Sequence, residues 1–219
     1  IEGSEIIRSL PDTNVLFISN HQTYFADVVA MFHVFNASLK GRENNIKNVL
    51  YLWNPKLNLY YVAAKETMQE GLLPRILAYA GAITVERTWR AKGKDVTEKK
   101  EVNPNDTENI KIALEDGWVI TFPQGTTKPF APGRRGTALL IKQVKPIVIP
   151  VVINGFWRAF NKKGLKFKKK GTLLSVTFKA PLEIDFEAST DIILTQIMDS
   201  IEQSKDYMMK GKHHWITKE

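Results

Sequence analysis

The segment VLFISNHQTYFAD, residues 15–27, joins two kinds of secondary structure. Its first four residues are apolar without a break, which is typical of a strand buried on both faces. A mostly apolar helical pattern begins at Ala26. The segment therefore predicts a strand followed directly by a helix, the repeating unit of α/β proteins. In such proteins the chemistry lies beyond the carboxyl ends of the strands, which is where His21 and Asp27 are found.

His21 and Asp27 are the two residue types that form a general base in many enzymes. An imidazole ring takes a proton from a hydroxyl group, and a carboxylate beside it fixes the tautomer and stabilises the imidazolium that forms. The nearest other acid, Asp12, lies before the strand rather than after it. Asp27 is therefore the best available partner for His21.

Strand and helix patterns alternate along the rest of the chain. We expect strands at 1–7, 14–19, 49–53, 60–64, 83–85, 118–122, 146–153 and 173–178, and helices at 26–35, 72–80, 106–114, 137–144 and 191–209. The charged stretch 88–104 has no periodicity and is expected to form a mobile loop. This order predicts an α/β fold with a mixed, largely parallel sheet flanked by helices. The 219 residues fit a single domain over 1–219.

Composition narrows the classes of function. The net charge of +8 favours an anionic partner, such as nucleic acid, an acidic carrier protein, a phosphorylated substrate or a membrane surface. The absence of cysteine excludes disulfides, thiol catalysis and cysteine-based metal sites. No apolar run approaches the roughly 20 residues of a membrane span, and no signal peptide is visible. Because the chain begins with Ile1 rather than methionine, we expect a further segment before it, for which a membrane anchor is one candidate.

Four short motifs follow one another along the chain. The first is Asn20-His21 with Asp27, and the second is GAITVER at 81–87. The third is FPQGTTK at 122–128, followed by GRRG at 133–136, and the fourth is the apolar run 146–153 around a central proline. In this order they resemble the motifs of the glycerolipid acyltransferase family, which includes 1-acylglycerol-3-phosphate acyltransferase. The resemblance covers almost the whole chain.

The resemblance implies a reaction as well as a fold with helices on both faces of the sheet. An acyl chain would move from a thioester, of acyl-carrier protein or coenzyme A, to the hydroxyl of a lysolipid acceptor. His21 would be the general base and Asp27 its orienting partner. The hydroxyl attacks the thioester directly, which suits a chain without cysteine. We expect no cofactor beyond the thioester co-substrate, and no metal, because no His or acid pair has ligand spacing on a shared face.

The resemblance also implies a set of substrate-binding residues. The set is Glu86, Arg87, Gln124, Gly125, Thr126, Lys128 and Arg135. Arg87 would hold an anionic head group, since a guanidinium binds phosphate in bidentate fashion. Gly125 and Thr126 would form a tight turn whose backbone amides face the substrate and support a developing oxyanion.

Two motifs depart from the family's pattern. Five residues separate His21 from Asp27, where the family has four. In a regular helix one extra residue rotates the next side chain by about 100°, so we expect the extra residue to be absorbed in a loop before the helix or in a π-type bulge. The third motif has Gln124 in place of the family's glutamate and Thr127 in place of its arginine.

The altered third motif leaves the acceptor open. One interpretation is a phosphate monoester held by Arg87, Lys128 and Arg135, most directly 1-acylglycerol-3-phosphate. A second is a hydroxy lipid without phosphate, such as an amino-acid lipid. A third is a non-catalytic module that binds lipid or acyl-carrier protein, motivated by the stretched spacing of the first motif. Nucleic-acid binding has only the charge in its favour, because no exposed basic sheet with interleaved aromatics is evident.

A lysine-rich stretch suggests where an anionic partner binds. Residues 162–170 hold six lysines around Leu165 and Phe167. Such a run is usually a solvated hairpin. The alternative is docking to anionic lipid or to an acidic carrier protein, since each basic residue near an anionic membrane adds about 1 kcal/mol. We therefore expect peripheral contact with an anionic membrane surface, at its cytoplasmic face.

Overall fold

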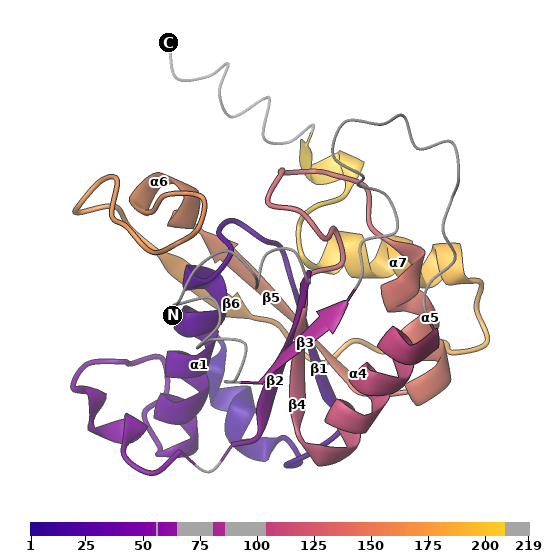
Figure 1. Ribbon diagram of the computed structural model, residues 1–219, viewed down its shortest axis with the longest axis horizontal. Helices are drawn as coiled ribbons and strands as arrows, with labels where there is room; N and C mark the ends of the chain where they lie inside the picture. The colour runs from indigo at the N-terminus through magenta and orange to yellow at the C-terminus, as the bar shows by residue number, and fades with distance from the viewer. Residues whose placement is uncertain (56, 65–80, 86–103, 209–219) are drawn as a thin grey trace.

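The computed structural model describes residues 1–55, 57–64, 81–85 and 104–208, and a six-stranded sheet forms its centre (Figure 1). The strand order is β3-β2-β4-β1-β5-β6, and only the pairing of β6 with β5 is antiparallel. The strands are β1 (Val15–Ser19), β2 (Leu59–Ala64), β3 (Ala82–Val85), β4 (Trp118–Thr121), β5 (Ile147–Asn154) and β6 (Ser175–Phe178). The mixed, largely parallel sheet predicted from the sequence is confirmed.

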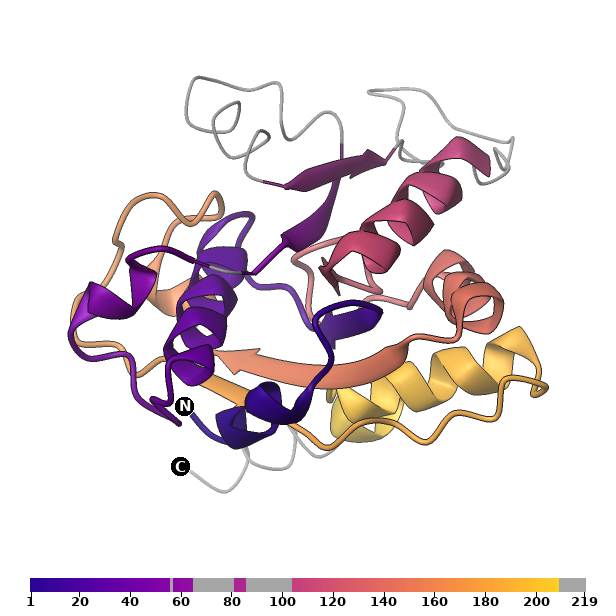
Figure 2. The same ribbon diagram turned by 90° about the horizontal axis from the view of Figure 1, so that it is seen from below.

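Helices cover both faces of this sheet (Figure 2). The α-helices are α1 (Ala26–Leu39), α4 (Pro104–Asp116), α5 (Arg135–Val144), α6 (Phe156–Ala159) and α7 (Thr190–Ser200), and two short 3₁₀-helices are η1 (Ser4–Ser9) and η2 (Val49–Leu52). Helix α1 lies on one face, and α4, α5 and α7 lie on the other. Among the described residues no helix is long and apolar enough to cross a membrane.

Strand β1 lies at the centre, and all five of its residues are buried. Successive side chains of a strand point to opposite faces, so Phe17 packs in the cluster beneath α1 and Ile18 packs in the cluster beneath α5 and α7. The Phe17 ring lies 4.5 Å from that of Phe35 and 5.4 Å from that of Trp118, measured between centroids. This double burial explains why β1 is a continuous apolar run.

The parallel arrangement positions the site. Strand β1 pairs with β4 and β5 on either side, with Phe17 opposite Ile120 and Ile149. Because parallel strands end at the same edge of a sheet, the segments that follow β1, β4 and β5 meet there. These segments contain the first, third and fourth sequence motifs.

Two predicted strands are wrong. In the stretch 1–7, Glu2 forms only an isolated bridge with Thr177, and residues 4–7 belong to η1. Gly3 precedes η1 in a left-handed conformation, where its backbone packs against the carbonyl of Phe178. The stretch 49–53 forms η2, because Asn48 caps it by accepting a hydrogen bond from the Leu50 amide. The C-terminal helix is also shorter than the predicted 191–209, since α7 ends at Ser200. The predicted helix 72–80, and the predicted loop 88–104 apart from its last residue, lie outside the described residues.

Candidate active site

His21 and Asp27 are in contact at the carboxyl end of β1. The Nδ1 atom of His21 lies 3.0 Å from Oδ2 of Asp27. Asp27 is fully buried, and the His21 side chain is 12% exposed. Residues 22–25 form an irregular loop and α1 begins only at Ala26, so the loop accommodates the additional residue between the two side chains.

The carboxylate of Asp27 is held by four donors. Its Oδ2 accepts the backbone N–H groups of Gln22 at 2.6 Å and Thr23 at 3.0 Å, in addition to His21. Its Oδ1 accepts the Thr23 hydroxyl at 2.8 Å. An ionised carboxylate is an acceptor only, so Nδ1 of His21 carries the proton of the neutral ring. The Nε2 atom is then the acceptor, and it has no hydrogen-bond partner among the described residues.

Phe122 joins the third motif to the first. Its ring stacks on that of His21, with centroids 4.0 Å apart and planes inclined by 24°. The Tyr24 ring lies 6.3 Å from His21 at a similar inclination. The imidazole is therefore held by a hydrogen bond at Nδ1 and by stacking on an aromatic ring.

Asn20 and Gln22 join the fourth motif to the first. The Asn20 amide forms two hydrogen bonds with the backbone of Ile153 in β5, donating to its carbonyl at 2.9 Å and accepting from its N–H at 2.8 Å. The Gln22 side chain donates to the same carbonyl at 3.0 Å and accepts from the Phe156 amide at 2.9 Å, at the start of α6. These bonds extend the pairing of β1 with β5 and fix the loop that carries His21. Sequence reasoning assigned no role to Gln22, Thr23 or the Phe122 ring, because their partners are set by tertiary contacts.

The third motif forms a braced loop after β4. Gln124 is 2% exposed, and its side-chain amide donates to the Ala131 carbonyl at 3.0 Å within the same loop. Gly125 adopts φ 59°, and its N–H donates to the Phe122 carbonyl at 2.8 Å, which confirms the expected tight turn. These contacts give Gln124 a structural role and occupy the Gly125 amide, so that amide does not face a substrate as we expected.

The remaining expected substrate-binding residues fall into three groups. Thr126 is half-buried, and its hydroxyl accepts from the amide of Lys128, whose side chain is exposed. Arg135 forms a bidentate ion pair with Asp191 of α7, at 2.9 and 2.7 Å, so its guanidinium is already bound to a carboxylate. Glu86 and Arg87 lie outside the described residues.

An apolar pocket of about 490 Å³ begins close to this site. It lies between α1 and the start of β2, and Phe25, four residues from His21, forms part of its wall. The other lining residues are Val28, Val29, Phe32, Leu57, Asn58, Leu59, Tyr60, Tyr61 and Gly81. Burial raises the pKa of the Tyr61 phenol to about 12, so this ring is neutral at physiological pH. The pocket is of the size that holds small organic ligands in proteins.

Among the described residues, no group of three or more histidine or acid side chains is placed to bind a metal ion.

Comparison with known proteins assigns the family. A sequence model of the acyltransferase family matches residues 1–154. The chain belongs to the acyltransferase family. The match contains all four motifs, including the His21–Asp27 pair and the strand β5. The resemblance predicted from the motifs is therefore confirmed at the level of an acyltransferase.

The fold of this acyltransferase is similar to that of a solved structure. That structure is the 1-acyl-sn-glycerophosphate (LPA) acyltransferase PlsC from Thermotoga maritima, with 15% sequence identity and a TM-score of 0.55. The similarity covers 91% of this chain and 67% of that chain. At this identity it shows the fold alone, and it confirms the predicted acyltransferase architecture. A comparison with curated proteins gave no match.

Proposed function

We propose that this acyltransferase moves a fatty acyl chain from a thioester, of coenzyme A or acyl-carrier protein, to the free hydroxyl of a monoacylated lipid. The acceptor we propose is 1-acylglycerol-3-phosphate, which gives phosphatidic acid. The observation that carries the proposal is the His21–Asp27 hydrogen bond of 3.0 Å, which leaves Nε2 of His21 as a proton acceptor.

The proposed step uses His21 as the base and no covalent enzyme intermediate. Nε2 takes the proton of the lipid hydroxyl as its oxygen attacks the thioester carbonyl, and a C–O bond forms. The tetrahedral intermediate collapses with cleavage of the C–S bond, and the thiolate leaves with the proton from Nε2. Asp27 stabilises the imidazolium between the two transfers, and its own four hydrogen bonds keep it oriented.

The backbone of the third motif supplies a donor for the developing oxyanion. The Gly125 amide already donates to the Phe122 carbonyl inside the turn, whereas the Thr126 amide donates to no acceptor among the described residues. Phe122, which stacks on His21, begins the same loop. We therefore assign oxyanion stabilisation to the Thr126 amide, since a fixed donor aimed at developing charge is a large catalytic contribution.

The apolar pocket supports a lipid substrate. Its aromatic and aliphatic lining suits an acyl chain, and burying each methylene group contributes about 0.8 kcal/mol. Phe25 lies both in the His21 loop and in the pocket wall, and we propose that a chain binds in the pocket with its reactive end toward His21.

The head group of the acceptor depends on the cations near the third motif. For a phosphate monoester we propose Lys128 as a ligand, together with Arg87 on the grounds of the motif resemblance. The ion pair between Arg135 and Asp191 favours the second candidate, a hydroxy lipid without phosphate, because it withdraws one guanidinium from phosphate binding.

A paired acceptor assay tests the proposal. The purified protein is supplied with acyl-coenzyme A or acyl-carrier protein, and with either 1-acylglycerol-3-phosphate or a hydroxy lipid without phosphate. We expect turnover of the phosphate lipid. Its KM should rise at least about tenfold in Lys128→Ala, because the variant loses about one charge-assisted hydrogen bond to the phosphate. Turnover of the other lipid alone would replace the first candidate by the second, and turnover of neither would contradict the proposed function.

A further inference from the structure

The segment after β5 is strongly basic. Residues 156–174, here named the basic lobe, contain one arginine, six lysines and no acid. No aspartate or glutamate occurs anywhere between residues 117 and 182. The lobe is therefore a region of concentrated positive charge on a chain whose net charge is only +8.

The basic lobe is folded rather than an extended solvated loop. Phe160 pairs with Phe167 in an isolated antiparallel bridge, and their rings lie 4.9 Å apart. The Asn161 side chain accepts the amides of Leu165 and Lys166 at 3.0 and 3.2 Å. The lobe projects from one corner of the molecule, above α1 (Figure 1).

Large apolar side chains are exposed on the basic lobe. Trp157 is 51% exposed, Phe167 is 70% exposed and Leu173 is 87% exposed. Among the described residues no carboxylate pairs with Lys166, Lys169 or Lys170. Aromatic and aliphatic side chains interleaved with lysines are the composition of segments that lie in the interface of an anionic bilayer.

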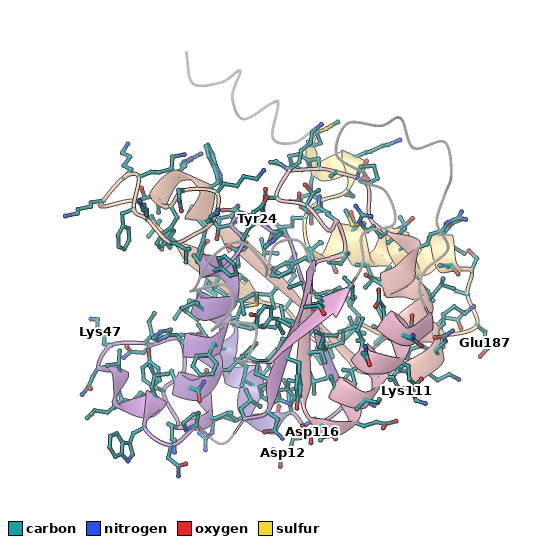
Figure 3. The ribbon with its side chains drawn as sticks, in the orientation of Figure 1. Asp12, Tyr24, Lys47, Lys111, Asp116 and Glu187 are labelled. Carbon is teal, nitrogen blue, oxygen red and sulfur yellow. The ribbon has the colours of Figure 1, made fainter. Side chains whose placement is uncertain are left out.

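The basic lobe is joined directly to the loop of the active site. The Tyr24 amide donates to the Lys162 carbonyl at 3.0 Å, and the Phe25 amide donates to the Lys163 carbonyl at 3.1 Å. Gly164 lies so close to α1 that a Cβ there would be 2.6 Å from the Ala26 nitrogen. In Figure 3 the Tyr24 side chain lies beside the lobe. A surface that binds the lobe is thereby brought close to His21.

A second exposed apolar cluster lies on the same side of the molecule. Val49, Leu50 and Trp53 of the η2 segment, residues 46–53, are 59%, 68% and 83% exposed. Figures 1 and 2 both place this segment and the basic lobe on one side, at either end of α1. Two separated apolar clusters suit an extended flat surface better than a small folded partner.

We infer that the basic lobe and the η2 segment form a face that docks the protein on an anionic lipid bilayer. The lysines bind lipid head groups, and Trp157, Phe167 and Leu173 enter the interface. An acidic carrier protein would satisfy the lysines but would leave the η2 cluster, at the other end of α1, exposed to water. The bilayer therefore accounts for more of the exposed surface. This inference concerns binding alone and holds for either lipid acceptor.

Vesicle binding without substrates tests the inference. Binding is measured by co-sedimentation with phosphatidylglycerol–phosphatidylcholine vesicles and with pure phosphatidylcholine vesicles, at low and high salt. We expect binding to the anionic vesicles only, weakened by salt. The triple variant Lys166→Gln, Lys169→Gln and Lys170→Gln should bind about 100-fold more weakly, about fivefold for each lysine. Leu173→Ala with Trp53→Ala should weaken binding at both salt concentrations, because the lost contact is apolar.

A matched control uses the opposite side of the molecule. Lys111→Gln with Ile112→Ala removes one lysine and one exposed apolar side chain from α4, and Figure 3 shows Lys111 far from the lobe. This control should bind vesicles like the wild type, and thermal melting of every variant verifies folding. Wild-type protein that does not bind anionic vesicles, or lobe variants that bind them unchanged, would overturn the inference. If the lobe variants lose binding to acyl-carrier protein but still bind anionic vesicles like the wild type, the partner of the lobe is the carrier protein rather than the bilayer.

Discussion

Nδ1 of His21 lies 3.0 Å from Oδ2 of Asp27, although five residues separate the two along the chain. The contact forms because the intervening loop bends so that the amides of Gln22 and Thr23 also bind the carboxylate. The pair is thus defined by the loop rather than by the periodicity of a helix.

Replacing Asp27 with asparagine should abolish most activity while keeping the side-chain volume. The amide no longer holds His21 with its proton on Nδ1, and it no longer stabilises the imidazolium. We expect kcat to fall by about 10⁴-fold, the loss seen for the same change in the Ser-His-Asp triad. Steady-state kinetics measure it, and a kcat within tenfold of the wild type would contradict the orienting role of Asp27.

Replacing Thr23 with valine should destabilise the fold and reduce activity less severely. The Thr23 side chain is fully buried, and its hydroxyl is the partner of Oδ1 of Asp27. Leaving that oxygen without a partner should lower the free energy of unfolding by about 1–3 kcal/mol. Denaturant titration measures the change, and Thr195→Val on the exposed face of α7 is the control, expected to stay within about 0.5 kcal/mol. Equal effects of the two variants would show that the bond to Asp27 contributes nothing.

Replacing Phe122 with leucine should lower kcat without a large change in stability. The leucine keeps an apolar contact but loses the stacked ring that fixes the imidazole plane. An aromatic pair contributes about 0.5–1.5 kcal/mol, so kcat should fall by about two- to tenfold. Leucine at Phe186, whose ring lies 5.7 Å from Nζ of Lys145 and belongs to neither the His21 site nor the basic lobe, is the control for loss of an aromatic residue. An unchanged kcat in Phe122→Leu would mean that the stacking is incidental.

Burial lowers the pKa of His33 below its ordinary 6.5. Its Nδ1 lies 2.8 Å from the buried hydroxyl of Tyr51. The unfolded state therefore binds a proton more readily than the folded state below about pH 6.5. The contribution of His33 to stability is complete above this pH and is lost as the pH falls through the folded pKa. We expect the wild type to lose stability between pH 7 and pH 5 more steeply than His33→Gln, by at most about 1.4 kcal/mol per pH unit. Parallel slopes in chemical denaturation would contradict this role of His33.

The sequence predicted the parts of the fold that depend on local pattern. Strands β1 and β5 are long apolar runs with both faces buried, so their hydrophobicity identifies them. The stretch 49–53 has similar residues, but Asn48 adopts φ 61° and caps a 3₁₀-helix that buries Tyr51 and leaves Val49 and Leu50 exposed. Composition alone does not distinguish an exposed apolar turn from a buried strand.

The active site was predictable where one segment contains both partners. His21 and Asp27 lie in the same loop, and the motif order points to them. The ion pair of Arg135 with Asp191 joins residues 56 positions apart, and Phe122 reaches His21 only because β4 pairs with β1. Such contacts follow from strand pairing and helix packing, which no single segment encodes.

The most direct test of the central claim is acyl transfer by His21→Ala. The substitution removes the base while Asp27 keeps its bonds to Gln22 and Thr23, so the loop should remain folded. We predict that transfer from acyl-coenzyme A or acyl-carrier protein to the lysolipid falls by about 10²- to 10⁴-fold, with an unchanged melting temperature. Transfer at the wild-type rate by folded His21→Ala would contradict the assignment of His21 as the general base.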